Sequence, residues 1–330
     1  MAIFEPSKAD ASPLMEIEDL VIRFPIRKGG RRAFITPVDH VSFSLRESEV
    51  LSIVGESGSG KSTIGRTLVR VNVPSHGRVL YQGRDVSHIK GAELRLYRSA
   101  IQMIFQDPFG SLNPVRTVEQ HLTFPLRKYE QVTGDKLSAR IDELLGRVGL
   151  TPVRETRSKY PHELSGGQRQ RVAIARALAV GPRVLVADEP ISMLDVSIRA
   201  GILELMNELK RDFRISFLYI THDLASARYF GDRILVLYGG RVMELAPSSE
   251  LIRNPLHPYT RLLLAASPGN PSRGPLPETS NSAPNLLEGR RGCPFADRCP
   301  LVTDVCRDEV PNLVDHGTSQ LRHFVACHHA

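Results

Sequence analysis

A glycine-rich segment that ends in lysine and serine is the clearest candidate for chemistry in the sequence. It reads, in order, Gly55, Glu56, Ser57, Gly58, Ser59, Gly60, Lys61 and Ser62, which is the complete P-loop pattern. It follows a short apolar run over 50–54, typical of a strand buried on both faces, and precedes a helical stretch that starts at Lys61. Glycines let backbone N–H groups turn onto phosphate oxygens, and a helix start adds positive potential. We therefore expect Lys61 to reach the β- and γ-phosphates of a nucleotide and Ser62 to ligate Mg²⁺.

Two carboxylates follow another buried apolar run. Asp188 and Glu189 come directly after 184–187. A carboxylate at the end of a buried strand is suited to hold Mg²⁺, directly or through water, and Asp188 fits that role. Glu189 projects differently and can polarise a water in line with the γ-phosphate. Taken alone, the two acids are equally consistent with a solvated loop, but beside a P-loop the phosphate role is the better interpretation.

A second candidate anion site lies before another helical stretch. It consists of Ser165, Gly166, Gly167 and Gln168, and it supplies an N-cap and a helix start. With Leu164 before it, the segment resembles the signature motif of the ATP-binding cassette (ABC) ATPases. The resemblance implies that two cassettes enclose two ATP molecules, each between the P-loop of one cassette and the signature motif of the other.

Further motifs of the same family follow. Gln106 resembles the glutamine of the Q-loop, which contacts Mg²⁺ and the attacking water. Asp195 ends a segment that resembles the D-loop, in which the family usually has alanine where Met193 stands. His222 resembles the switch histidine that contacts the γ-phosphate. Phe24 stands where the family has an aromatic side chain that stacks on adenine, with a core strand residue as the alternative.

The resemblance covers about residues 16–266 and assigns a role to each of these side chains. It implies an ATPase that hydrolyses ATP to ADP and phosphate with Mg²⁺ as the cofactor. The implied catalytic residues are Glu189, His222, Gln106 and Lys61. The implied nucleotide-binding residues are Phe24, Gly55, Ser57, Gly58, Ser59, Gly60, Lys61, Ser62, Thr63, Gln106, Asp188, Ser165, Gly166, Gly167, Gln168 and Asp195. The implied Mg²⁺ ligands are Ser62, Gln106 and Asp188.

Two segments narrow the resemblance to importers. Residues 106–114 are similar to the Q-loop extension of oligopeptide and dipeptide importers, and residues 254–260 to the segment that opens their C-terminal extension. The lead-in at 101–105 and the start of the P-loop resemble the second, F-type ATPase of the importer pair. The resemblance implies a subunit that powers peptide uptake by ATP-driven dimerisation of cassettes at the cytoplasmic face of the cell membrane.

The implied partners are a second, distinct ABC ATPase subunit, two transmembrane permease subunits and, indirectly, an extracytoplasmic solute-binding protein. One alternative is an importer ATPase for another solute, such as an oligosaccharide or nickel. Another is a soluble ABC ATPase that acts on nucleic acid. Because the chain has one P-loop, one signature motif and no long coiled coil, we expect no nucleic-acid partner.

The four cysteines lie together near the end of the sequence. They are Cys293, Cys299, Cys306 and Cys327. Four thiolates in a small proline-rich segment of a cytosolic protein suit an iron–sulfur cluster or a tetrahedral Zn²⁺ site. The resemblance to peptide-importer ATPases implies a 4Fe–4S cluster, with Zn²⁺ and free thiols as the alternatives. Further candidate ligands are His323, His328 and His329.

Length and composition set limits on these interpretations. The chain has 330 residues, of which 41% are hydrophobic and 24% charged, which is globular composition with room for two domains. No apolar run approaches the roughly 18 residues that a membrane span needs, and the start lacks the apolar region of a signal peptide. We therefore expect neither a secreted nor an integral membrane protein. The net charge is +7, and all of the positive excess lies in residues 1–266, where ATP and docking at a membrane complex are sufficient reasons for it.

The pattern of elements predicts an α/β fold with a parallel core, since short buried strands alternate with helical stretches. We expect buried strands at 184–187 and 217–220, a solvated loop at 27–32, and mainly helix from 91 to 179 with a break near 107–114. The resemblance implies a P-loop NTPase cassette with a RecA-like core, an antiparallel β subdomain and a helical subdomain. The expected domains are a nucleotide-binding domain over 1–266, with its helical subdomain at about 107–178, and a proline-rich linker with a metal-binding extension over 267–330.

Overall fold

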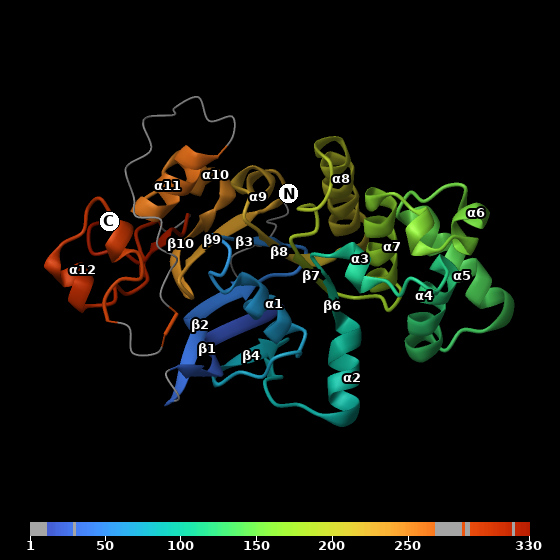
Figure 1. The fold of residues 1–330 in the computed structure, drawn as a ribbon, viewed down its shortest axis with the longest axis horizontal. Helices are drawn as coiled ribbons and strands as arrows, with labels where there is room; N and C mark the ends of the chain where they lie inside the picture. Colours follow the sequence, from blue (N-terminus) through green and yellow to red (C-terminus); the bar gives the residue numbers. More distant parts are fainter. Residues whose placement is uncertain (1–11, 29–30, 268–285, 288–290, 319–320) are drawn as a thin grey trace, which may run out of the picture.

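Two sheets and a separate group of helices make up the described chain (Figure 1). The computed structural model describes residues 12–28, 31–267, 286–287, 291–318 and 321–330. Most of the predicted proline-rich linker therefore lies outside the described residues. Within the described residues, no helix has the length and apolar character needed to cross a membrane.

The larger sheet has eight strands, and its central part is parallel. Its order is β11-β12-β10-β9-β3-β8-β7-β6. The strands are β3 (Val50–Val54), β6 (Ile101–Ile104), β7 (Val184–Asp188), β8 (Ser216–Thr221), β9 (Arg233–Tyr238), β10 (Arg241–Pro247), β11 (Val314–Asp315) and β12 (Phe324–Val325). β3 lies parallel to β8 and β9, and β7 lies parallel to β6 and β8, so the carboxyl ends of these strands share one edge. The predicted α/β class and the two predicted buried strands are confirmed.

Residues 91–179 are mainly helical, as expected, and β6 is an exception that the sequence analysis did not predict. This four-residue strand follows α2 (Gly91–Ala100) directly, without a turn signal between them. Ile101 and Ile104 are buried and pair with Val184 and Ala187 of β7. Tertiary pairing with a strand about 80 residues away therefore decides the structure here, and local propensity does not.

The smaller sheet is antiparallel and has four strands in the order β2-β1-β4-β5. They are β1 (Met15–Lys28), β2 (Arg31–Leu45), β4 (His76–Tyr81) and β5 (Arg84–Asp85). The predicted loop at 27–32 is wrong in its flanks, because Arg27 pairs with Arg32 in the β1–β2 ladder. An antiparallel hairpin can carry charged side chains into solvent and remain a strand, so charge alone does not mark a loop.

Helices cover the larger sheet on both faces (Figure 1). One face meets α1 (Lys61–Leu68) and the antiparallel sheet. Above the other face in Figure 1 lie α8 (Val196–Phe213), α9 (Leu224–Phe230), α10 (Ser248–Arg253) and α11 (Pro258–Ala266). The helical group consists of α3 (Pro108–Ser111), α4 (Val118–Pro125), the π-helix η1 (Leu126–Glu130), α5 (Gly134–Arg147), α6 (Val153–Ser158), the 3₁₀ turn η2 (Pro161–Glu163) and α7 (Gly166–Leu178).

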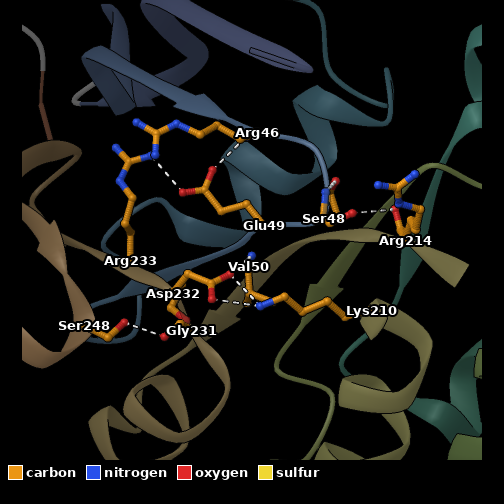
Figure 2. A network of polar contacts seen from close by, with 12 residues as sticks. Arg46, Ser48, Glu49, Val50, Lys210, Arg214, Gly231, Asp232, Arg233 and Ser248 are labelled. Atoms are coloured by element: carbon orange, nitrogen blue, oxygen red, sulfur yellow. Dashed lines mark hydrogen bonds and ion pairs between the residues drawn. The ribbon is translucent and has the colours of Figure 1, made fainter. Parts of the chain in front are cut away.

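Polar contacts fix β3 at the end opposite the P-loop (Figure 2). Asp232 accepts a hydrogen bond from Val50 N–H at 2.7 Å and from Lys210 Nζ at 2.7 Å. Glu49, beside Val50, accepts from Arg233 Nη1 at 3.2 Å. A shift of one residue in β3 would turn its side chains to the opposite face, so this network helps to set where the P-loop begins.

The C-terminal residues complete the edge of the larger sheet. They contain the 3₁₀ turn η3 (Ala296–Arg298), α12 (Asp304–Asp308) and the short strands β11 and β12, and β12 pairs with β10. Glu244 of β10 is fully buried, and His323 Nε2 lies 2.7 Å from its Oε1. The same carboxylate accepts from the N–H groups of Leu256 and His257 just before α11. Packing therefore joins this extension to the cassette. The division at residue 266 stays a prediction.

Candidate nucleotide site

The P-loop connects β3 to α1 in a backbone conformation that requires glycine. Gly58 has φ 79° and Gly60 has φ 106°, both in the left-handed region. A Cβ at Gly60 would lie 1.9 Å from the carbonyl oxygen of Pro37, and one at Gly55 would lie 2.1 Å from that of Leu237. The loop is therefore pressed against β2 and β9. The glycines permit the turn that aims backbone N–H groups at a phosphate.

Lys61 lies at the start of α1 with only 4% of its surface exposed. Its Nζ donates to the carbonyl oxygens of Gly55 at 2.7 Å and Glu56 at 2.8 Å. Burial lowers the pKa of Lys61, and the nearby carboxylates of Glu189 and Asp188 act in the opposite sense. The ammonium group is thus held inside the loop, within reach of the phosphates that the loop would bind.

Ser62, the residue after Lys61, forms a hydrogen-bonded pair with Asp188. Ser62 Oγ donates to Asp188 Oδ1 at 2.8 Å, and Asp188 is 2% exposed. Burial raises the pKa of the Asp188 carboxyl group. A hydroxyl and a carboxylate are the donors that Mg²⁺ prefers, so the residues present fit this cofactor.

Gln106, Glu189 and His222 meet at one carboxylate. Gln106 Nε2 donates to Glu189 Oε2 at 3.2 Å, and His222 Nδ1 lies 3.3 Å from the same oxygen. The three residues follow β6, β7 and β8 respectively, so the shared edge of the sheet brings them together. The Glu189 side chain is 14% exposed, and its backbone has φ 46°, a left-handed conformation that is uncommon for a residue other than glycine.

Other predicted residues lie apart from this cluster. Ser165 caps α7, where its Oγ accepts from Gln168 N–H and its own N–H donates to Gln168 Oε1. Gly166 and Gly167 form the first turn of α7, which belongs to the helical group on the right of Figure 1.

Asp195 precedes α8 and is exposed, and Phe24 lies on β1 opposite Ile35 with 36% of its surface exposed. Each of these roles stays a prediction.

Residues around a surface groove were missed by the sequence analysis. The groove has a volume of about 850 Å³ and is lined by Val115, Arg116, Gln120, Thr123, Phe124, Arg127 and Lys128. Phe124 is 60% exposed and Val115 76% exposed, and Lys128 Nζ lies 5.4 Å from the centre of the Phe124 ring. No motif marks these positions. Their nearness to the predicted Q-loop extension at 106–114 was the available signal.

Two further residues at the P-loop were also missed. Tyr259 of α11 accepts a hydrogen bond from Glu56 N–H at 3.0 Å, and Arg298 donates to the Glu56 carboxylate at 2.8 Å. Tyr259 lies in the predicted importer segment at 254–260, but nothing in the pattern connects it to the P-loop. Arg298 lies between two cysteines and carried no signal of its own.

The four cysteines lie in one part of the structure. Cys293 N–H donates to Cys306 O at 2.7 Å, and Cys306 Sγ lies 3.5 Å from His329 Nε2. Burial raises the pKa of Cys293 to about 11, and the other three cysteines contribute to the same shift. Across the described part of the chain, however, no three His, Cys, Asp or Glu side chains converge in an arrangement that would hold a metal ion.

Comparison with protein families gives two matches. Residues 38–192 match the model described as ABC transporter, and residues 243–306 match the model described as oligopeptide/dipeptide transporter, C-terminal region. The second match extends across the predicted division at residue 266. It includes α11 and three of the four cysteines.

Individual proteins with similar sequences and folds agree with these matches. The chain is 43% identical over 328 residues to the oligopeptide transport ATP-binding protein AppF of Bacillus subtilis, covering 97% of this chain and 98% of that protein. It is 40% identical over 322 residues to the di/tripeptide transport ATP-binding protein DppF of Pseudomonas aeruginosa, covering 96% and 98%. Its fold matches the dimeric cassette MJ0796 bound to ADP and phosphate with a TM-score of 0.63 and 31% identity. That match covers 71% of this chain and 98% of the cassette.

The Ser62–Asp188 pair generates a prediction about Mg²⁺. In an Asp188→Asn variant the Asn oxygen can still accept from Ser62, but the negative charge is lost. We expect the affinity of the ATP complex for Mg²⁺ to fall on the order of 100-fold, because loss of a residue that holds or orients a metal ion lowers metal affinity by up to about this factor. Calorimetric titration of ATP with and without Mg²⁺ measures the change.

The matched control is Asp212→Asn, because Asp212 lies in an exposed pair with Arg211. We expect this variant to bind Mg²⁺ and ATP as the wild type does. If Mg²⁺ tightens ATP binding equally in the Asp188→Asn variant and the wild type, Asp188 is not a ligand of the ion.

Proposed function

Since this chain belongs to the ABC transporter ATPase family and carries the C-terminal region of the oligopeptide/dipeptide transporters, we propose that it is the ATP-hydrolysing subunit of a peptide importer. The whole-length similarity to AppF and DppF, both peptide transport ATP-binding proteins by name, supports this substrate class over sugars or nickel. The match at 243–306 adds to that support.

The contact of Gln106 and His222 with the Glu189 carboxylate is the observation that carries the proposal. A carboxylate beside a phosphate-binding loop can take a proton from water and direct the resulting nucleophile at the γ-phosphate. Gln106 and His222 would fix the orientation of that carboxylate, and the half-exposed ring of His222 would contact the γ-phosphate. Ser62 and Asp188 would hold Mg²⁺, which would supply positive charge beside the phosphates. Lys61 provides a second positive charge beside the phosphates.

The signature residues of this chain would serve the nucleotide of a partner cassette. Ser165 and Gln168 bond to each other and lie in the helical group, away from the P-loop. Met193 is 55% exposed and Val196 79% exposed beside Asp195, so apolar surface is available where a second cassette would pack. We propose that this second cassette is a distinct ATPase subunit, so that ATP binding closes the pair and hydrolysis opens it.

The surface groove lined by residues between Val115 and Lys128 is suited to contact a permease subunit. It is apolar at Val115 and Phe124 and basic at Arg116, Arg127 and Lys128. It follows the predicted Q-loop extension, so a movement of Gln106 at the nucleotide can reach it through a short segment of chain. We propose that a segment of a permease subunit docks there, which places the chain at the cytoplasmic face of the cell membrane.

The Glu189→Gln variant tests the hydrolytic role. Glutamine keeps the shape of the side chain and its contacts but cannot accept a proton. We expect ATP hydrolysis to fall by about 100-fold or more while ATP still binds, because general-base catalysis contributes a factor of this size. ATP binding without hydrolysis should also shift the variant and its partner ATPase subunit toward a closed dimer, which size-exclusion chromatography of the two subunits with ATP measures.

The matched control is Glu47→Gln, since Glu47 lies in an exposed pair with Arg183. We expect hydrolysis by this variant to match the wild type. Normal turnover by the Glu189→Gln variant would show that another residue activates the water.

We also propose that the four cysteines hold a metal centre, with a 4Fe–4S cluster as the first choice and Zn²⁺ as the second. The donor set supports this, since four thiols lie in one small segment, Cys306 buried and the other three half-buried. No three of them converge in the described structure, so the metal would have to draw the thiols together when it binds. Cys293, Cys299, Cys306 and Cys327 would be the ligands. When bound, the metal would add cohesion to a segment that has few apolar side chains of its own.

Anaerobic purification followed by iron, sulfide and zinc analysis tests the metal centre. We expect equal amounts of iron and sulfide in the wild type, and loss of both in a Cys306→Ser variant, because four ligands are needed. His316→Gln is the control, since His316 is an exposed histidine of the same segment and not a candidate ligand. Zinc without iron would contradict the cluster. The absence of both metals would show that the cysteines are free thiols.

A further inference from the structure

Glu56, the second residue of the P-loop, is held on three sides. Its N–H donates to Tyr259 Oη at 3.0 Å, and its carbonyl oxygen accepts from Lys61 Nζ at 2.8 Å. Its carboxylate accepts from Arg298 Nη1 at 2.8 Å. Backbone and side chain of one loop residue are therefore fixed by contacts from three separate parts of the chain.

Arg298 comes from the far end of the sequence. It lies 242 residues after Glu56, at the end of η3 and directly before Cys299. Its side chain is 12% exposed, and that of Glu56 is 33% exposed. The bond to Glu56 raises the pKa of the guanidinium group above its usual value. A charged pair shielded to this degree is stronger than one in open solvent.

Arg298 packs against two rings of a three-ring aromatic cluster. Tyr238, Tyr259 and Phe295 form a cluster with ring centres 4.6 to 5.3 Å apart. The guanidinium carbon of Arg298 lies 5.7 Å from the Tyr238 ring and 5.8 Å from the Phe295 ring, and Nη1 also lies 3.3 Å from Tyr238 Oη. Tyr238 ends β9, Tyr259 lies in α11, and Phe295 directly precedes η3 in the cysteine-bearing segment. The cluster therefore joins the cassette to that segment.

The contacts of Lys61 give this arrangement a consequence for binding. When phosphate enters the loop, Lys61 Nζ exchanges the carbonyl oxygens of Gly55 and Glu56 for phosphate oxygens. Glu56 then loses one of its three contacts. The bonds to Tyr259 and Arg298 remain and keep the loop backbone in the conformation that binds phosphate, so less ordering is required when the nucleotide binds.

We propose that Arg298 is a positioning residue for the nucleotide, which links the cysteine-bearing segment to ATP binding through Glu56. The inference rests on the proposed function in one respect, namely that the P-loop binds ATP. Linkage of this kind is reciprocal, so ATP bound at the P-loop stabilises the segment that carries Arg298 by the same factor.

The binding test compares Arg298→Gln and Glu56→Gln with the wild type in the full-length chain. We expect each variant to raise the Kd for ATP about tenfold, the size of effect expected for a hydrogen bond between charged groups. The double variant should raise Kd no further than either single variant, because both remove the same interaction. Arg298→Lys, which keeps the charge, should recover part of the affinity.

Arg307→Gln is the matched control, since Arg307 lies in the same segment in an exposed pair with Asp297. Its Kd should equal that of the wild type. Glu56→Gln keeps the test decisive if Arg298→Gln fails to fold, because Glu56 lies in a partly exposed loop. Kd values within twofold of the wild type for both Glu56→Gln and Arg298→Gln would overturn the proposal, as would fully additive effects in the double variant.

Two measurements separate positioning from a merely structural role. Loss of positioning weakens ground-state and transition-state binding equally, so KM for ATP should rise while kcat stays constant. A structural defect would lower kcat and leave KM unchanged, which would overturn the proposal.

Hydrogen exchange gives the reciprocal readout. ATP should slow exchange of the Cys293, Ala296 and Arg298 amides by up to about tenfold in the wild type. The Glu56→Gln variant should show no such slowing.

The outcomes distinguish this inference from the proposed function. A wild-type chain that does not bind ATP contradicts the proposed function. A wild-type chain that binds ATP, with Arg298→Gln and Glu56→Gln unchanged in Kd and in hydrogen exchange, contradicts the positioning role of Arg298 alone.

Discussion

The parallel register of β3, β8, β7 and β6 is the constraint on which the nucleotide site depends. Val54 pairs with Thr221, Asp188 with Ile220 and Ile104 with Ala187. These pairs set the strand ends side by side, so the P-loop, Gln106, Glu189 and His222 emerge at one edge. A slip of one residue would turn each strand's side chains to the wrong face. The contacts of Asp232 and Glu49 at the opposite end of β3 help to prevent such a slip (Figure 2).

In our account this chain supplies the residues around the phosphates, and a partner cassette covers the nucleotide from the other side. Ser165 and its neighbours lie in the helical group, where their bonds are local, and the apolar residues beside Asp195 are exposed. The activity of this chain therefore depends on a partner cassette in our account. The C-terminal segment contacts the P-loop from within the same chain, since β12 completes the larger sheet and Arg298 bonds to Glu56. The loop is thus supported from within the chain before any partner binds.

The sequence predicted the parts of the site that depend on local pattern. The P-loop glycines, Asp188, Glu189 and His222 follow short buried strands, and such strands and turns leave a pattern in consecutive residues. β6 was missed because Ile101–Ile104 follows a helix without a turn and becomes a strand only by pairing with β7. Arg298 was missed for a similar reason. Its contact with Glu56 joins residues 242 positions apart, and a single ion pair of this kind has no periodicity in the sequence.

The central claim is that this chain converts ATP hydrolysis into peptide uptake, and transport by the assembled complex measures it most directly. The chain would be reconstituted in proteoliposomes with its partner ATPase, the permease subunits and a peptide-loaded binding protein. We expect labelled di- and oligopeptides to accumulate in the compartment that contains this chain and ATP. We also expect the loaded binding protein to stimulate ATP hydrolysis. ATP hydrolysis that responds to polynucleotide, with no uptake of peptide, would contradict the account.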